Sequence, residues 1–271
     1  MNVRIGLAQH RIGPDMEENL RQAQRAVLAC AGQGAQLVLL PEMFCCLYQL
    51  ERLRACAQPL GGEIWKHLRA LACQAGVYLL GGSMPELDAQ GRIYNTSFFF
   101  SPAGEELACY RKCHLFDVSL PGGLCIQESS VFTPGEQLRV VESPFGKIGL
   151  AICFDLRFPE QFRALADRGA QLVLVPAAFN STTGPAHWEI NCRSRALDNQ
   201  VFLCACAPAA APDGPYPYYG HSMAVDPWGR ILTELSGEAC ERVVTLDLDE
   251  TARIRAQLPL LQSRRPELYR Q

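Results

Sequence analysis

The sequence has almost no excess of charge of either sign. Among its 271 residues, 25 Lys and Arg stand against 28 Asp and Glu, which leaves a formal net charge of −3. Without a basic excess, no electrostatic field would hold nucleic acid or an anionic membrane surface. The composition therefore excludes nucleic acid and membrane lipid as expected partners.

Long apolar runs and targeting segments are also missing. The longest apolar stretch, 201–211, is interrupted by Pro208 and is much shorter than the roughly 20 residues of a membrane-spanning helix. The chain starts directly with a strand-like segment at 3–8, without the basic region and cleavage site of a secretory signal. With 48% apolar and 20% charged residues, the chain is also not disordered. We expect a cytoplasmic globular protein.

Cysteine, by contrast, is abundant, yet the positions of the cysteines indicate neither a disulfide framework nor a metal site. The thirteen cysteines are odd in number, and no two have the C-x-x-C spacing of thiolate zinc sites and redox loops. Without secretion, disulfides are not expected, so most of these residues are predicted to be small buried packing groups. Because H-E-x-x-H, P-loop and G-x-G-x-x-G patterns are absent too, we expect neither a metal nor another cofactor.

Short apolar runs of strand length alternate with longer amphipathic segments of helix length. This alternation is typical of an α/β fold in which helices cover both sheet faces. We expect strands at 5–9, 36–40, 77–81, 94–100, 106–110, 147–153, 171–175 and 201–207, helices at 16–31, 64–74, 160–168 and 188–198, a loop-rich stretch at 112–134, and a last hairpin over 222–235 and 242–246.

Two stretches of the chain are similar to each other. Residues 34–44 (GAQLVLLPEMF) and 169–179 (GAQLVLVPAAF) are identical at eight of eleven positions, and upstream RIGLA at 4–8 is matched by KIGLA at 147–151. Two copies in the same order indicate pseudo-symmetry, whereas a solenoid would need more repeats. Two similar halves packed sheet on sheet predict a four-layer α-β-β-α sandwich with internal pseudo-two-fold symmetry, which we expect to be a single domain over 1–271.

Reactive side chains follow three of the expected strands. Glu42 comes after the strand at 36–40, Lys112 after the strand at 106–110, and Cys153 at the end of the strand at 147–153. Sites in α/β proteins gather beyond the carboxyl ends of strands, so these groups can meet. Taken singly, each has a simpler explanation: a helix-start charge, a surface lysine and a core cysteine.

Together the three groups would form an acyl-transfer site. Glu42 would accept the thiol proton as general base, and Cys153 would attack a carbonyl or nitrile carbon to form a thioester. The step from strand to turn to helix at Cys153 predicts a nucleophile elbow, with the Phe154 amide and Lys112 holding the oxyanion. A protease-like pair of Cys153 with a histidine is a poorer explanation, because it leaves the glutamate and the lysine unused.

These segments resemble the three motifs of the nitrilase superfamily of carbon–nitrogen hydrolases, in order and over nearly the whole chain. The resemblance implies a Glu-Lys-Cys triad at Glu42, Lys112 and Cys153, with a second active-site glutamate at Glu128, and it implies the four-layer sandwich. One departure is Phe154, where many relatives have Tyr, but only its backbone amide is needed. The motifs are LPE at 40–42, YRKCHLFD at 110–117 and GLAICFDLRFPE at 149–160.

Within the superfamily, the sequence looks most similar to the omega-amidase type. Such enzymes release ammonia from 2-oxo dicarboxylic acid monoamides, namely α-ketoglutaramate and α-ketosuccinamate. By this resemblance, Arg157 and Thr183 would bind the distant carboxylate, Phe179 would line the pocket, and Tyr48 lies in a loop that bounds it. The segments that carry the likeness are 110–117, 179–189, 198–201 and 220–222.

Several alternatives stay open. The neighbouring subfamily that acts on deaminated glutathione shares TGPAHWE at 183–189 and RRPELY at 264–269 with this chain, and the loops 44–50, 118–128 and 209–219 should decide pocket size. A catalytically idle binding or scaffold member and a thiol-based redox sensor are further readings. The apolar and basic tail, 258–271, and the family resemblance both indicate subunit contacts, so we expect a homodimer or a larger homo-oligomer.

Overall fold

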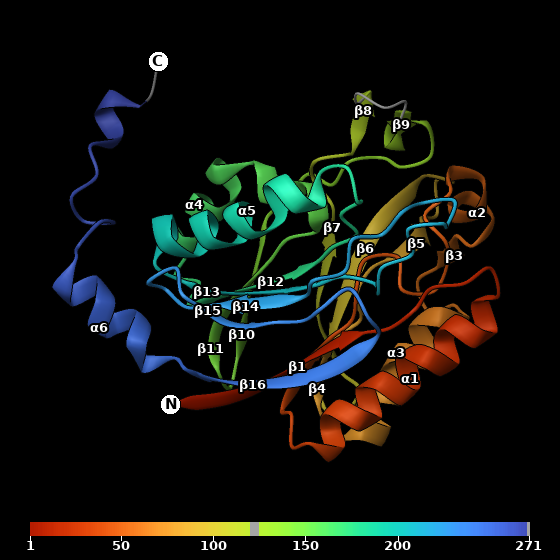
Figure 1. The fold of residues 1–271 in the computed structure, drawn as a ribbon, viewed down its shortest axis with the longest axis horizontal. Helices are drawn as coiled ribbons and strands as arrows, with labels where there is room; N and C mark the ends of the chain where they lie inside the picture. Colours follow the sequence, from red (N-terminus) through yellow and green to blue (C-terminus); the bar gives the residue numbers. More distant parts are fainter. Residues whose placement is uncertain (120–124, 270–271) are drawn as a thin grey trace.

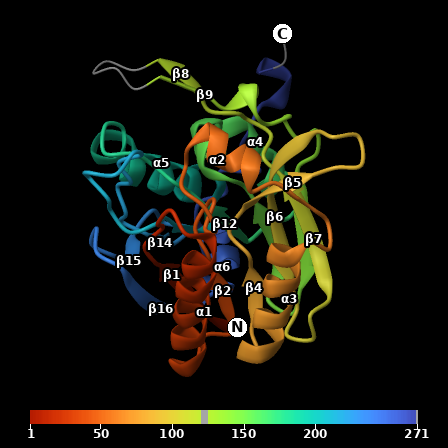
Figure 2. The same cartoon turned by 90° about the vertical axis from the view of Figure 1, so that its right-hand side faces the viewer.

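The computed structural model describes residues 1–119 and 125–269 as two β-sheets that lie face to face between two layers of helices (Figures 1 and 2). The predicted four-layer α-β-β-α sandwich is therefore confirmed. Within the described residues, no helix is both long and apolar enough to cross a membrane. The cytoplasmic location stays a prediction.

The first sheet carries the N-terminal half of the chain together with one late strand. Helices α1 (Met16–Gly32) and α3 (Glu63–Ala75) cover its outer face (Figure 1). Its strands follow the order β16 (Cys240–Asp247), β1 (Asn2–Gln9), β2 (Leu37–Leu39), β4 (Tyr78–Leu80), β6 (Ile93–Phe100), β5 (Met84–Leu87) and β3 (Gln58–Pro59), and β7 (Glu106–Arg111) also pairs with β6.

The second sheet carries the second half, and helices α4 (Pro159–Asp167) and α5 (Gly184–Asn199) cover its outer face (Figure 1). Its strands follow the order β10 (Arg139–Ser143), β11 (Gly146–Leu150), β12 (Leu172–Pro176), β13 (Phe202–Cys206), β14 (Met223–Val225) and β15 (Ile231–Glu234). The remaining elements are α2 (Leu50–Ala55), the pair β8 (Asp117–Ser119) and β9 (Cys125–Gln127), the 3₁₀ turns η1 (Glu128–Ser130), η2 (Cys153–Arg157) and η3 (Pro266–Leu268), and α6 (Asp249–Gln257).

Alternation along β1 explains how one strand contacts two layers. Val3, Ile5 and Leu7 belong to the core between the sheets, because successive side chains of a strand point to opposite faces. On the other face, Gly6 meets α1. A Cβ atom at Gly6 would lie 2.7 Å from the Cβ of Cys30, so only glycine lets the helix approach this closely.

The internal repeat is confirmed in the strand register. β1 pairs with β2 in parallel with Ile5 opposite Leu37, and β11 pairs with β12 in parallel with Ile148 opposite Leu172. In both sheets an antiparallel strand precedes this pair, a parallel strand follows it and an antiparallel strand comes next. The two halves therefore share strand order and direction as well as sequence.

Two expected boundaries and one expected strand pairing were wrong. The strand expected at 147–153 ends at Leu150, because the chain turns into η2 at Cys153. The helix expected at 188–198 begins earlier, at Gly184, with Pro185 in its first turn, where its missing N–H is not needed. β14 and β15 form a hairpin, but β16 leaves it and pairs with β1 along eight residues, which carries the C-terminal region to the first sheet.

Candidate active site

The four predicted catalytic residues lie in one buried cluster. Glu42 follows β2, Lys112 follows β7, Glu128 begins η1 and Cys153 begins η2. All four side chains are buried, and both carboxylates and the ammonium group are fully so. Residues from both halves of the chain are thus brought together at the carboxyl ends of their strands, as expected for an α/β fold.

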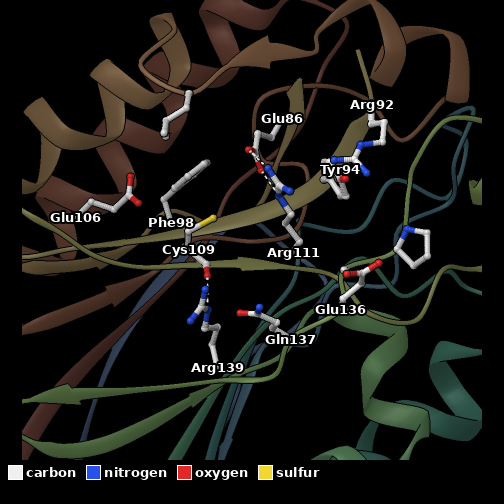
Figure 3. A pocket seen from close by; sticks show the side chains of 13 residues that line it. Glu86, Arg92, Tyr94, Phe98, Glu106, Cys109, Arg111, Glu136, Gln137 and Arg139 are labelled. Atoms are coloured by element: carbon white, nitrogen blue, oxygen red, sulfur yellow. Dashed lines mark hydrogen bonds and ion pairs between the residues drawn. The ribbon is translucent and has the colours of Figure 1, made fainter. Parts of the chain in front are cut away.

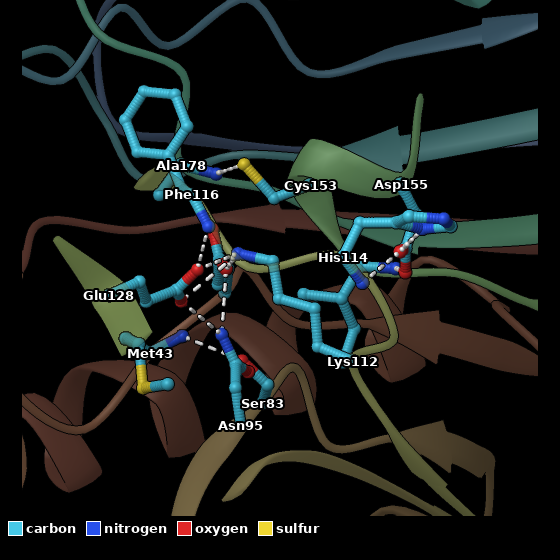
Figure 4. A network of polar contacts seen from close by, with 12 residues as sticks. Met43, Ser83, Asn95, Lys112, His114, Phe116, Glu128, Cys153, Asp155 and Ala178 are labelled. Atoms are coloured by element: carbon cyan, nitrogen blue, oxygen red, sulfur yellow. Dashed lines mark hydrogen bonds and ion pairs between the residues drawn. The ribbon is translucent and has the colours of Figure 1, made fainter. Parts of the chain in front are cut away.

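Lys112 lies between the two glutamates, and Figure 4 shows it beside Glu128. Its Nζ is 2.9 Å from Oε1 of Glu42, and it is 3.1 and 3.0 Å from Oε1 and Oε2 of Glu128. Burial by itself lowers the pKa of Lys112, but the two carboxylates outweigh burial and raise it. The amine therefore stays protonated and supplies a fixed positive charge.

Glu128 is held by donors from several segments. Its Oε1 accepts from the Tyr48 hydroxyl at 2.7 Å and from Asn95 Nδ2 at 3.2 Å, and its Oε2 accepts from the Phe116 amide at 2.5 Å. Together with Lys112, these bonds supply partners to both oxygens. Glu128 is thus suited to orienting the lysine.

Glu42 differs from Glu128 because only one of its two carboxylate oxygens has hydrogen-bond partners among the described residues. Oε1 accepts from Lys112 and from Asn95 Nδ2, at 2.9 Å each, whereas Oε2 has no hydrogen-bond partner among the described residues. Burial raises the pKa of Glu42, Lys112 opposes this rise and the charge of Glu128 adds to it. A raised pKa makes the free carboxylate a better proton acceptor, which is what a general base requires.

Cys153 occupies an unusual backbone conformation. Its φ is +44°, in the left-handed region that residues other than glycine rarely adopt, and η2 begins at this residue. The first amides of a helix have no partner inside it, so N–H groups at the start of this turn can donate to a ligand. The Phe154 amide is the first of these after the nucleophile. This geometry resembles the predicted nucleophile elbow.

The thiol of Cys153 is neutral at rest. Burial raises its pKa, Glu42 raises it further, and Lys112 lowers it only in part. The Ala178 amide, just beyond β12, lies 3.4 Å from Sγ and donates to it. Because the thiol holds its proton, attack on a substrate needs a base, and Glu42 is the neighbouring group that can take this role.

A second buried network ties the nucleophile turn to the lysine segment (Figure 4). Both oxygens of the fully buried Asp155 accept hydrogen bonds. Oδ2 accepts from the Tyr110 hydroxyl at 2.6 Å and from the Ile152 amide at 2.9 Å, and Oδ1 accepts from the His114 amide at 3.1 Å and contacts His114 Nδ1 at 2.7 Å. Asp155 thus fixes Ile152, next to Cys153, against the residues on either side of Lys112.

The predicted substrate-binding residues line one narrow pocket with Cys153, including Tyr48, Phe154, Arg157, Phe179 and Thr183, together with Phe116, Ala178, Asn180 and Tyr216. The pocket encloses about 10 Å³ of free space, room for about one water molecule. Side chains at its mouth must shift when a substrate enters.

Arg157 is the cation of this pocket. Its guanidinium carbon lies 5.0 Å from the ring centre of Phe179 and 5.7 Å from that of Phe154, and Nη1 is 3.0 Å from His187 Nδ1. Burial lowers its pKa, and no carboxylate of a described residue pairs with it. Since Arg remains charged at any physiological pH, its other N–H groups can bind a carboxylate ligand.

Thr183 has a contact within the protein. Its hydroxyl lies 3.2 Å from Oδ1 of Asn180 and donates to it, and its amide donates to the same oxygen at 2.9 Å. The hydroxyl proton is therefore used within the protein. Asn180, which the sequence did not single out, lines the same pocket as this threonine.

A larger cavity, of about 390 Å³, lies apart from this cluster on the outer side of β6 and β7 (Figure 3). Here Arg111 packs over the Tyr94 ring at 3.8 Å and forms two hydrogen bonds with the buried Glu86, at 2.9 and 2.6 Å. Glu86 also accepts from the Thr96 hydroxyl at 2.6 Å. No residue that the sequence predicted as functional lines this cavity.

The remaining cysteines are not all packing groups. All thirteen are free thiols, and seven of them, including Cys153, are buried. Of the other twelve, six are partly or fully exposed, so the expectation of mostly buried cysteines holds for only half of them. Among residues 1–119 and 125–269, no group of three or more His, Cys, Asp or Glu side chains is placed to hold a metal ion.

Sequence reasoning missed the polar residues that support the cluster. Asn95 contacts both glutamates, and it lies in β6. The triplet Asn95-Thr96-Ser97 inside a run that is otherwise aromatic and aliphatic was the available signal, because buried polar groups require partners. Asp155 and Tyr110 were part of the recognised motifs, yet their contact across the two segments could not be inferred from spacing.

Comparison with known proteins gives a consistent result. The family model for carbon–nitrogen hydrolases matches residues 4–256. The omega-amidase of Mus musculus is 42% identical to this chain over 266 residues, which cover 98% of this chain and 96% of the mouse protein.

Two solved structures have the same fold. Nit3 of Saccharomyces cerevisiae, described as a member of branch 10 of the nitrilase superfamily, is 34% identical with a TM-score of 0.89, and the match covers 97% of each chain. An amidase from Nesterenkonia sp. AN1, in a mutant form whose active-site cysteine carries an acrylamide adduct, is 32% identical with a TM-score of 0.81 and 98% coverage of both chains.

Proposed function

The chain belongs to the carbon–nitrogen hydrolase family, in the nitrilase superfamily, and we propose that it is an omega-amidase-type enzyme that hydrolyses the terminal amide of 2-oxo dicarboxylic acid monoamides to the 2-oxo acid and ammonia. The observation that carries the proposal is the buried cluster of Cys153, Glu42 and Lys112. Its thiol still holds a proton, and its base still has a free oxygen.

In the first half of the reaction, Glu42 takes the thiol proton as Sγ of Cys153 attacks the amide carbon. The negative charge that develops on the carbonyl oxygen is stabilised by the Phe154 amide and by the charge of Lys112. When the carbon–nitrogen bond breaks, Glu42 returns the proton to the leaving nitrogen. Ammonia departs and a thioester remains on Cys153.

In the second half, water replaces ammonia. Glu42 removes a proton from the water as its oxygen attacks the thioester carbon, and the same oxyanion donors act again. The carbon–sulfur bond then breaks, and the thiolate regains its proton from Glu42. The free acid and the resting enzyme result, so one residue serves as base and acid twice.

At the far end of the substrate, Arg157 would bind the carboxylate. It is the cation of the pocket without a carboxylate partner, and the rings of Phe154 and Phe179 keep it in place. Deaminated glutathione, which is of tripeptide size, remains the alternative substrate. Residues 120–124 of the loop 118–128 lie outside the described residues.

The decisive experiment measures ammonia release from α-ketoglutaramate by the purified protein. We expect turnover by the unchanged chain and its loss on Cys153→Ala, whereas the same change at the exposed Cys73 should have no effect. Turnover that survives Cys153→Ala would contradict the mechanism. Turnover of deaminated glutathione alone would leave the mechanism intact and replace the substrate.

We also propose that copies of the chain associate through the outer face of α5. Ile190, Leu197 and Trp228 line a groove there and are each more than 40% exposed, which is unusual for such large apolar side chains. In the tail, Leu258, Leu260, Leu268 and Tyr269 are exposed as well. Ile190→Glu should convert a dimer or larger assembly to a monomer in light scattering, and a monomeric unchanged protein would refute this proposal.

A further inference from the structure

Three thiols lie together in the part of the chain that runs from the general base to the end of α2. Cys45 and Cys46 follow Glu42 closely in the sequence, and Cys56 caps the C-terminal end of α2. The thiol of Cys46 is hydrogen-bonded to the thiols of both Cys45 and Cys56. Cys46 is 4% exposed, whereas Cys56 is partly exposed. The proposed mechanism uses none of these three thiols.

Of the three thiols, Cys46 and Cys56 are the pair that oxidation can join. Cys45 and Cys46 are consecutive, so their Cα atoms are about 3.8 Å apart, which is shorter than the roughly 4.4–6.8 Å that a disulfide needs. Cys46 and Cys56 are separated by nine residues, and their thiols are already in contact. A disulfide between these two thiols is therefore the bond that this arrangement favours.

The two thiols of this pair differ in reactivity. The hydrogen bond from Cys46 and the positive charge of Arg52 lower the pKa of Cys56 to about 7, against the effect of burial. Hydrogen bonds to both neighbours and burial raise the pKa of Cys46 well above its usual range. Because the thiolate is the reactive form of cysteine, Cys56 is the first to react with an oxidant. An accessible thiol of low pKa beside a second thiol is typical of a redox-sensitive cysteine.

The other partly exposed cysteines differ from Cys56. Burial raises the pKa of Cys109 to about 12, and it also raises the pKa values of Cys113 and Cys240. The nucleophile Cys153 holds its proton because burial raises its pKa as well. We therefore expect a mild oxidant to react with Cys56 before it reacts with any of these four thiols.

The pair lies next to a residue of the substrate pocket. Tyr48 comes two residues after Cys46, lines the pocket and donates to Glu128 at 2.7 Å, and its amide donates to the Tyr218 hydroxyl at 2.9 Å. A disulfide between Cys46 and Cys56 would close a ring that contains Tyr48 and α2. To form it, the two sulfur atoms must move from hydrogen-bonding distance to about 2 Å. We expect this movement to shift Tyr48 relative to Glu128.

We propose that a hydroperoxide oxidises Cys56, that Cys46 then forms a disulfide with it, and that this bond slows turnover by displacing Tyr48. The disulfide itself goes beyond the proposed function and does not depend on it. Only the effect on turnover rests on that function.

The oxidation proceeds in two steps. In the first, the Cys56 thiolate attacks one peroxide oxygen, the oxygen–oxygen bond breaks, and the other oxygen takes up a proton and leaves as water, so that Cys56 becomes a sulfenic acid. In the second, the sulfur of Cys46 attacks the sulfenic sulfur, the sulfur–oxygen bond breaks, and the hydroxyl leaves as water with the Cys46 proton. Two thiols are oxidised to one disulfide, and one molecule of hydrogen peroxide is reduced to two molecules of water.

The first test maps the bond and needs no activity assay. The reduced full chain is treated with a small excess of hydrogen peroxide, blocked with iodoacetamide and digested with trypsin. Trypsin cuts after Arg52 and Arg54, so Cys46 and Cys56 lie on separate peptides unless a disulfide joins them.

We expect the two peptides to be linked, and dithiothreitol to separate them. The link should be absent from Cys46→Ser and from Cys56→Ser, and it should persist in the matched control Cys73→Ser, which changes an exposed cysteine outside this cluster. If one variant does not fold, the other still decides. Oxidation of Cys153 while Cys56 stays reduced, or a disulfide between another pair, would overturn the proposal.

The second test measures the effect on turnover. Ammonia release from α-ketoglutaramate is followed before peroxide, after peroxide and after dithiothreitol. We expect kcat of the unchanged chain to fall by about tenfold or more on oxidation, as for a misplaced group of the pocket, and to recover on reduction. Cys46→Ser should keep its kcat under the same treatment.

An equal loss in Cys46→Ser would assign the inhibition to oxidation of Cys153 and would overturn the effect on turnover, as would an unchanged kcat in the disulfide-bonded protein. Failure of the proposed function is distinct from both results. It would appear as no ammonia release before peroxide is added, and the peptide map would still decide whether Cys46 and Cys56 form the bond.

Discussion

Arg111 and Lys112 are neighbours at the end of β7, and each forms ion pairs with buried glutamates, yet the two pairs differ in kind. Successive side chains of a strand point to opposite faces, so Arg111 faces the outer cavity in Figure 3 and Lys112 the buried cluster in Figure 4. Glu86 meets Arg111 with both of its oxygens. Glu42 meets Lys112 with one, and its other oxygen has no partner among the described residues.

The difference shows which feature separates a structural ion pair from a reactive one. The Glu86 carboxylate has both of its oxygens bonded to one fixed cation. A carboxylate in a cluster of two acids and one amine keeps a raised pKa and a free lone pair. Burial is common to both pairs, so it does not by itself mark a site.

The largest expected effect comes from Glu42→Gln. Loss of the base should lower kcat for ammonia release by about 10²–10⁴-fold. The thermal unfolding midpoint should change little, because the substitution replaces an incompletely paired buried carboxylate with a neutral group of the same shape. Steady-state kinetics and calorimetry on the same preparation check both parts, and near-normal kcat would contradict the assignment of the base.

A smaller loss of kcat is expected from Asp155→Asn, because Asp155 only positions the turn that carries Cys153. The amide cannot accept at both oxygens, so either the Tyr110 and Ile152 donors or the His114 donors lose their partner. Because the nucleophile turn would shift relative to Lys112, we expect kcat to fall by about 10–100-fold. KM should change less, since Arg157 is untouched. A change confined to thermal stability would show that Asp155 has only a structural role.

Glu86→Gln should show the opposite pattern to Glu42→Gln. Removing this carboxylate charge leaves the partly exposed Arg111 without its partner, so we expect the free energy of unfolding to fall by about 1–3 kcal/mol. The kcat should remain close to that of the unchanged protein. Chemical denaturation with parallel activity assays tests this, and a loss of kcat comparable with that of Glu42→Gln would remove the distinction between the two pairs.

The smallest expected effect is a shift in the dependence of kcat/KM on pH. Glu42 must be ionised to accept the thiol proton, so activity should decline as pH falls through its pKa. Because that pKa is raised above 4.5, the acid limb of kcat/KM should have its midpoint above pH 4.5. The value belongs to the coupled cluster rather than to one residue. A midpoint at or below 4.5 would contradict the electrostatic description.

The architecture could be predicted from the sequence because it depends on local patterns along the chain. Alternating apolar runs located most strands, and the repeated segment predicted two similar halves, whose pairings of Ile5 with Leu37 and Ile148 with Leu172 agree. The same offset that relates Ile5 to Ile148 relates His10 to Cys153. At that position the first half has a buried imidazole bonded to backbone carbonyls in place of a nucleophile, so similar halves need not carry similar chemistry.

The supporting contacts of the site could not be predicted, because they join segments that are distant in the sequence. Three strand ends indicated Glu42, Lys112 and Cys153, and the structure brings them together. The role of Asn95 between two carboxylates and the bond from the Ala178 amide to the thiol depend on side-chain orientation in three dimensions. The path of β16 to the first sheet was missed for the same reason, because strand pairing over more than 200 residues leaves no local signal.

The central claim is that Cys153, activated by Glu42, carries the acyl group. The most direct measurement is rapid quenching in acid during turnover of α-ketoglutaramate, followed by intact-mass analysis and peptide mapping of the thirteen cysteines. We predict an adduct with the mass of the substrate less ammonia, on Cys153 alone, and its absence in the Glu42→Gln protein. Turnover without an adduct, or an adduct on another cysteine, would contradict the mechanism.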